Sequence, residues 1–145
     1  MKKILFFSIL STSLFFVACT KKTVIEAPPT NTNPNPIVGL WVGTFQITGA
    51  TNLGSFYQSF SLFPDSTLIE EGGGSNGQMW LGKGTWSLKG TAWSATITNG
   101  DISQGTWTQQ ATAKYDSVAG TLSQGALAYT TGGSGSITFS LKRVN

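Results

Sequence analysis

Short runs of alternating apolar and polar residues, separated by turn signals, make up the chain from residue 37 to its end. In the run 135–143, for example, Ile137, Phe139 and Leu141 alternate with Thr138 and Ser140. No window in this part holds apolar residues at i, i+3, i+4 and i+7 over two clear turns, which an amphipathic helix would need. A period of two instead predicts β-strands that bury one face.

Seven segments rich in Gly, Asp or Asn interrupt these runs, and residues of these types favour turns. The turn segments are 49–54, 64–66, 72–77, 89–90, 99–101, 116–120 and 131–135. They leave eight predicted strands at 39–48, 55–63, 66–72, 79–88, 91–98, 105–115, 120–129 and 135–143. Because the connections are of hairpin length and closure removes exposed edges, we predict an all-β, eight-stranded antiparallel up-and-down β-barrel. A β-sandwich is the alternative.

The first 36 residues differ from this body. Met1-Lys2-Lys3 is followed by a mainly apolar run of about fourteen residues, 4–17. That run is too short for a membrane-spanning helix and fits a secretory signal peptide over residues 1–18. Residues 19–36 hold four of the five prolines with Thr and Asn between them, which predicts an extended tether. The predicted barrel domain spans 37–145.

Phe16-Val17-Ala18-Cys19 resembles the lipobox of bacterial lipoproteins, in which the Cys is acylated and becomes the mature N-terminus. The resemblance implies lipidation at Cys19, the only cysteine of the chain. Ordinary cleavage after Ala18, leaving a free thiol, is the alternative. Thr20 stands where inner-membrane lipoproteins often have Asp, so the resemblance implies an outer-membrane protein at the periplasmic face. Lys21 and Lys22 either contact anionic headgroups or belong to a solvated tether.

The charge distribution excludes nucleic acid as a partner. The chain has a formal charge of +3 and a sequence pI near 9.2. Residues 37–145, however, carry five basic and five acidic side chains, so the whole excess lies in the first 36 residues. A domain without net positive charge lacks the electrostatic footprint of a nucleic-acid-binding protein.

Gly39-Leu40-Trp41 resembles the G-x-W that opens the first strand of lipocalin and avidin barrels. The run 137–143 is similar to their last strand, whose terminal basic residue packs over that Trp. The resemblance therefore assigns barrel closure to Gly39, Trp41 and Arg143, with a cation–π contact between the last two. The overall likeness is to small lipocalin-like lipoproteins of bacteria. Gly43 stands where avidins place the Asn that binds biotin, and the chain lacks the axial His of haem-binding barrels.

The residue types present argue against an enzyme. The chain has no His, which is the commonest general base and metal ligand. Glu70 and Glu71 are adjacent, so on a strand they point to opposite faces and cannot act as one acid–base pair. We interpret them as a solubilising strand end, with a ligand contact as the alternative. Turn roles are predicted for Asp65, Asp101 and Asp116 in preference to calcium binding. No cofactor or metal is predicted.

Aromatic and amide side chains are the remaining candidates for a binding site. Trp41 and Trp86 are interpreted as core residues. Trp80 shares a strand face with Gly82 and Gly84, which are small enough to leave space beside its ring. Trp107 shares a face with Gln109 and Tyr115, and that face would line a cavity if it points inward; the outward orientation stays open. The candidate ligand-binding residues are Trp80, Trp107, Gln109, Tyr115, Gln58 and Gln124.

Two functions follow from these residues. The first is a lipid-anchored barrel that binds a small lipophilic or amphipathic ligand at its open end. The second is a non-enzymatic structural or protein-interaction domain of the cell envelope, with a filled barrel. The two differ in the volume inside the barrel.

Overall fold

The structure is a computed structural model, and it describes residues 35–49, 53–74, 77–101, 105–132 and 135–144. The predicted signal peptide, Cys19 and the tether up to residue 34 lie outside these residues. Within the described ranges, no helix has the length and apolar character that crossing a membrane requires.

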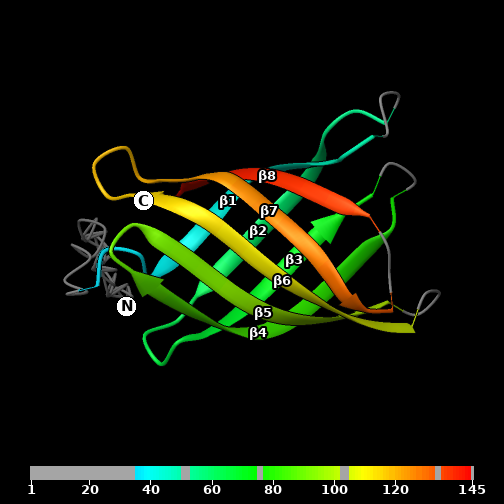
Figure 1. The fold of residues 1–145 in the computed structure, drawn as a ribbon, viewed down its shortest axis with the longest axis horizontal. Helices are drawn as coiled ribbons and strands as arrows, with labels where there is room; N and C mark the ends of the chain where they lie inside the picture. Colours follow the sequence, from blue (N-terminus) through cyan, green and yellow to red (C-terminus); the bar gives the residue numbers. More distant parts are fainter. Residues whose placement is uncertain (1–34, 50–52, 75–76, 102–104, 133–134, 145) are drawn as a thin grey trace, which may run out of the picture. The chain divides into compact units, whose positions relative to one another are not determined.

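Eight antiparallel strands close into one barrel, as predicted (Figure 1). The strands are β1 (Gly39–Ile47), β2 (Phe56–Leu62), β3 (Thr67–Gly73), β4 (Met79–Lys89), β5 (Ala92–Asp101), β6 (Gly105–Asp116), β7 (Thr121–Thr131) and β8 (Ser136–Arg143). Each strand pairs with the next along the chain, and β8 pairs with β1. The turn predicted at 99–101 is wrong, because β5 continues through Asp101 and pairs with β6 there.

The alternation read from the sequence gives the inner and outer faces of the strands. On β8, Ile137, Phe139 and Leu141 are buried while the residues between them are exposed. On β6, Trp107, Gln109, Ala111, Ala113 and Tyr115 are all buried. The face of β6 that the sequence left open therefore points inward.

One end of the barrel is closed by apolar packing. The turns between β2 and β3, β4 and β5, and β6 and β7 lie at this end, together with Ile37 just before β1 (Figure 1). Ile37 is fully buried, and its carbonyl oxygen accepts a hydrogen bond of 2.8 Å from the Trp41 indole N–H. The Trp86 indole N–H donates to the Thr67 carbonyl at 2.9 Å. Both indoles are thus buried with their polar atom satisfied, which removes the cost of burying it.

The three residues assigned to barrel closure lie together at this closed end. Trp41 and Arg143 are opposite one another in the β1–β8 pairing. The Arg143 Nη2 donates to the Val38 carbonyl at 2.9 Å, and a side chain at Gly39 would contact the guanidinium. Gly39 also has φ +137°, which residues with a Cβ rarely adopt. The described ring partner of Trp41 is Tyr115, in an edge contact with centroids 5.9 Å apart.

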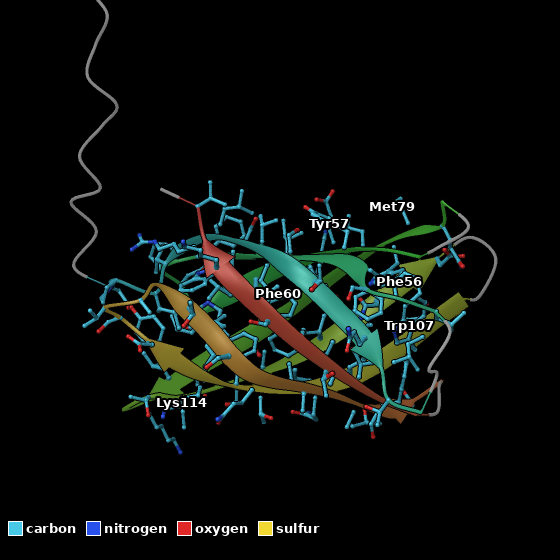
Figure 2. The ribbon with its side chains drawn as sticks, turned by 90° about the horizontal axis from the view of Figure 1, so that it is seen from above. Phe56, Tyr57, Phe60, Met79, Trp107 and Lys114 are labelled. Atoms are coloured by element: carbon cyan, nitrogen blue, oxygen red, sulfur yellow. The ribbon has the colours of Figure 1, made fainter. Side chains whose placement is uncertain are left out.

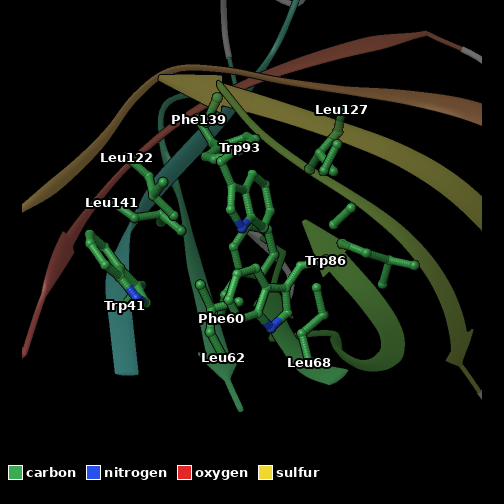
Figure 3. Packing of buried hydrophobic residues seen from close by; sticks show 14 of the residues in the cluster. Trp41, Phe60, Leu62, Leu68, Trp86, Trp93, Leu122, Leu127, Phe139 and Leu141 are labelled. Carbon is green, nitrogen blue, oxygen red and sulfur yellow. The ribbon is translucent and has the colours of Figure 1, made fainter. Parts of the chain in front are cut away.

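An aromatic layer crosses the middle of the barrel (Figure 3). Phe60 stacks on Trp93 with ring centroids 5.4 Å apart, and Phe139 meets the Phe60 and Trp93 rings edge-on. All three side chains are buried. This layer separates the closed end from the opposite end, where the connections β1–β2, β3–β4, β5–β6 and β7–β8 lie.

The three turn-type aspartates have different surroundings. Asp65 Oδ1 accepts hydrogen bonds from the Thr67 N–H and hydroxyl, and Asp116 Oδ1 accepts from the Val118 and Ala119 N–H groups. These hydrogen bonds lower the pKa of both carboxyls. Asp101 instead lies at the end of β5, where its Oδ2 accepts a hydrogen bond from the Gln78 side chain at 3.1 Å.

Candidate functional site

A cavity of about 300 Å³ lies inside the open end of the barrel. Its volume is at the lower end of the range for small-molecule sites and would hold about ten water molecules. Exposed Ile47 and Leu53 and partly exposed Gln78 line its outer part, so the cavity opens between the connections at this end. In Figure 2, Phe56 and Trp107 lie at this end and Phe60 lies deeper in the barrel.

The cavity has one polar side and one apolar side. The apolar side comes from β1, β2, β7 and β8, and its inward residues are Phe45, Phe56, Leu127 and Ile137. The polar side comes from β2, β3, β4 and β6, and its residues are Gln58, Glu70, Trp80, Trp107 and Gln109. An apolar wall with a few convergent polar groups is the usual construction of a small-molecule site.

Glu70 is the carboxyl group of this cavity. Its side chain is only 1% exposed, and its Oε1 accepts a hydrogen bond of 2.6 Å from Gln58 Nε2. Burial raises the pKa of the carboxyl, although the Gln58 hydrogen bond acts in the opposite direction. The Asn99 and Trp80 side chains lie close enough to lower the pKa as well, but neither meets the geometry of a hydrogen bond to Glu70. The pKa of Tyr129 is also raised, mainly by burial and to a smaller extent by the nearby Glu70 carboxylate.

Several buried polar atoms of this region have no hydrogen-bond partner within the protein. Those on the lining are Gln58 Oε1, Glu70 Oε2, Gln109 Oε1, Trp80 Nε1 and Trp107 Nε1. Both amide atoms of buried Asn99, which is paired with Trp107 on β6, are also unpartnered. A buried polar atom without a partner costs about 1–3 kcal/mol. Such atoms are rare in folded proteins, so a cluster of them indicates a place where a bound molecule or water completes the hydrogen bonds.

Glycines on the inner face make room for the large side chains of the site. A Cβ at Gly72 would overlap the Trp80 indole, and a Cβ at Gly82 would overlap the Asn99 amide. The prediction that Gly82 leaves space beside Trp80 is therefore wrong, because Asn99 fills that space. Likewise, a Cβ at Gly125 would overlap the Phe139 ring, and a Cβ at Gly84 would overlap the backbone of β5.

Aromatic rings form a continuous series along the cavity. Phe56 and Phe45 have centroids 5.1 Å apart, Phe45 and Trp80 5.6 Å, and Trp80 and Trp107 6.4 Å. Contacts at these distances hold neighbouring rings in defined orientations. The two cavity indoles, Trp80 and Trp107, are therefore fixed by packing against other rings. Their N–H groups lack partners, as does that of Trp93, which lies outside the cavity.

Four of the six candidate binding residues lie together on the cavity: Trp80, Trp107, Gln109 and Gln58. Tyr115 does not, although it shares the inner face of β6 with Trp107. The two residues are eight positions apart, about 26 Å along a strand at ~3.3 Å per residue. Tyr115 therefore lies at the closed end against Trp41.

Gln124 also lies away from the cavity, on the outer surface. The register between β7 and β8 shifts between Leu122 and Gly125, and Gln124 has φ +52°. This bulge inserts an extra residue, so Leu122, Gly125 and Leu127 point inward while Gln124 is exposed. Simple alternation cannot locate such a shift.

Sequence reasoning missed Asn99, and for Glu70 it gave a ligand contact only as the alternative. The interpretation of Glu70 as a solubilising residue is wrong, whereas Glu71 is exposed. Glu70 is two residues after Leu68, so the two side chains share one face of β3. Because Ile69 between them is also apolar, the sequence alone does not show which face points inward. Asn99 has the same parity as Trp93, Ala95 and Ile97, which marks it as inward-facing once β5 is known to continue past residue 98.

In the part of the chain that the structure describes, no three His, Cys, Asp or Glu side chains are grouped as a metal site would require. No protein-family model, curated protein or solved structure matches the chain.

Proposed function

We propose that this barrel binds a small amphipathic molecule in the cavity at its open end. The observation that carries the proposal is the group of five unpartnered polar atoms on the polar side of the cavity, opposite a wall of apolar side chains. A ligand with a polar head and an apolar body would satisfy these atoms and cover that wall at once. The alternative of a filled barrel fits the closed end but leaves the cavity without a role.

The proposal is tested by filling the cavity. Leu127→Trp places a large ring from β7 into the cavity, and Ala128→Trp, one residue along, places the same ring on the outer face. The full chain in lipid nanodiscs is titrated with 2-phenylethanol by calorimetry, with protein-free nanodiscs as the blank. We expect binding to be lost in Leu127→Trp and retained in Ala128→Trp, with the fold of both checked by circular dichroism.

A second measurement asks whether the protein carries a molecule from the cell. The full chain is purified from cells that export it, and its mass is compared by native mass spectrometry before and after denaturation. A retained small molecule that is absent from the Leu127→Trp variant supports the proposal. If no small molecule is retained and neither 2-phenylethanol nor 2-phenylethylamine binds, the barrel is not a ligand carrier and the interaction domain becomes the better function.

We further propose that the barrel is attached to the periplasmic face of the outer membrane by acylation of Cys19. The support is the apolar run 4–17 followed by the lipobox-like residues 16–19. Cys19→Ser should move the protein from the membrane fraction to the soluble periplasmic fraction, whereas Thr20→Ser should not. Continued membrane attachment of Cys19→Ser would disprove the anchor without affecting the proposal for the cavity.

A further inference from the structure

The polar side of the cavity holds a buried carboxyl but no basic side chain. Neither Lys nor Arg is among the described residues that line the cavity. The other titratable side chain there is Tyr129, which faces the same space from β7 and is half-buried. Because a buried carboxylate without a positive partner is costly, Glu70 requires either a proton or a cation from outside the protein.

The unpartnered oxygen atoms match a specific chemical group. Glu70 Oε2, Gln58 Oε1 and Gln109 Oε1 are three acceptors on three strands, and each belongs to a side chain exposed by no more than 2%. A primary ammonium group has three N–H donors and no acceptor. One such group beside Glu70 could donate to the Glu70 and Gln58 oxygens, which lie next to one another, and supply the missing positive charge, with Gln109 as a further acceptor on the same cavity.

The aromatic side chains favour the same kind of ligand. Trp80 and Trp107, with centroids 6.4 Å apart, line the cavity on the strands that follow Glu70 around the barrel. Indole is the best of the aromatic side chains at attracting a cation to its face. The Trp80 and Trp107 N–H groups remain to be satisfied by water or by an oxygen atom of the ligand.

We propose that the ligand of this cavity is a small organic amine whose protonated nitrogen binds Glu70, Gln58 and Gln109, with its apolar part against Phe45, Leu127 and Ile137. This inference rests on the proposed function and narrows it to one class of ligand. A compact aromatic or alkyl amine suits a volume of about 300 Å³. The competing arrangement is a protonated Glu70 that hydrogen-bonds a neutral ligand, and it makes the opposite prediction for ligand charge.

The test compares probes that differ only in their polar group. The full chain in lipid nanodiscs is titrated with 2-phenylethylamine, 2-phenylethanol and phenylacetate by calorimetry. We expect the amine to bind about 30-fold or more tightly than the alcohol, because removing one partner of a buried charge pair has an effect of that size. Phenylacetate should not bind measurably.

Two variants, each of which removes one carboxylate from β3, show whether the amine binds at Glu70. Glu70→Gln replaces the buried carboxyl with an amide of equal size, and Glu71→Gln does the same on the exposed face of the same strand. Amine affinity should fall about 30-fold or more in Glu70→Gln and stay within about twofold of wild type in Glu71→Gln. Affinity for 2-phenylethanol should change little in either variant.

The outcomes separate this inference from the proposed function. If the alcohol binds wild type as tightly as the amine, or if Glu70→Gln binds the amine normally, the ligand is not an amine held by Glu70, yet the barrel remains a binding protein. If no probe binds and no small molecule is retained from cells, both proposals fail. The comparison of amine with alcohol needs only the wild-type chain, so it holds even if Glu70→Gln does not fold.

Discussion

The two ends of the barrel use the same residue type in opposite ways. At the closed end, the indole N–H groups of Trp41 and Trp86 donate to backbone carbonyls at 2.8 and 2.9 Å. At the open end, the indole N–H groups of Trp80 and Trp107 have no partner within the protein. All four rings pack against neighbours, and the two pairs differ in whether the indole N–H has a partner and in whether the ring borders the cavity. The Trp93 indole N–H in the aromatic layer also has no partner, although Trp93 does not line the cavity. We therefore propose a ligand role only for the unpartnered indoles that border the cavity.

The largest expected effect is a loss in the free energy of unfolding when an indole ring is deleted, and this loss should differ between the two ends. Trp41→Ala should lower the free energy of unfolding by about 3–5 kcal/mol, because it empties a fully buried site. Trp107→Ala should cost roughly 1–2 kcal/mol, because its ring borders a cavity that water can enter. Urea unfolding of both variants measures the difference. Equal losses would show that the two ends do not differ in this way.

A smaller effect is expected from the guanidinium at the closed end. Arg143→Met keeps the length of the side chain but removes the hydrogen bond to the Val38 carbonyl, which should cost about 1.5–2 kcal/mol. Lys142→Met, one residue earlier and exposed on the outer face, should cost almost nothing. Thermal unfolding of the pair tests whether Arg143 helps to hold β1 and β8 together.

Replacing Trp by Phe removes the indole N–H together with part of the ring, and doing so at each end tests the comparison most directly. Trp86→Phe leaves the Thr67 carbonyl without its donor and should cost about 1 kcal/mol beyond the loss of ring size. Trp80→Phe removes an unpartnered donor, so its cost should come from ring size alone. A loss in Trp80→Phe that matches the loss in Trp86→Phe would mean that Trp80 is bonded as Trp86 is.

The smallest expected effect is a change in how stability depends on pH. The pKa of Glu70 is raised in the folded state, so between its ordinary value near 4.5 and that raised value the folded protein binds more protons than the unfolded chain. Stability from this group therefore falls as pH rises through that window. Glu70→Gln should remove the fall, and Glu71→Gln should keep it.

The aspartates act in the opposite direction and in a different range. The lowered pKa values of Asp65 and Asp116 give stability that is present above their ordinary value of 3.8 and lost as pH falls through their folded-state values. Urea unfolding above pH 4.5 therefore isolates the contribution of Glu70. An unchanged pH profile in Glu70→Gln would contradict a raised pKa for this carboxyl.

Alternation and turn signals were sufficient to predict the eight strands, because both depend on local sequence. They did not decide which face of β6 points inward, which the structure settles. Other features depend on pairing between strands. The bulge that turns Gln124 outward appears only in the β7–β8 register, and the position of Tyr115 far from Trp107 follows from strand length and closure. Glu70 was interpreted as a solubilising residue, with a ligand contact only as the alternative, because a polar residue inside a barrel breaks the rule that apolar faces point inward. A ligand site is where such an exception is expected.

The glycine beneath Trp80 has a consequence for how such a barrel could change its ligand. Gly72 has no contact with the cavity interior in its own right, yet the Trp80 indole occupies the space that a Cβ there would need. Any larger residue at position 72 would push the indole away from the wall and into the volume that a ligand needs. The volume of the cavity is therefore set partly by a residue that does not line it, and one methyl group at that position would suffice to change this volume.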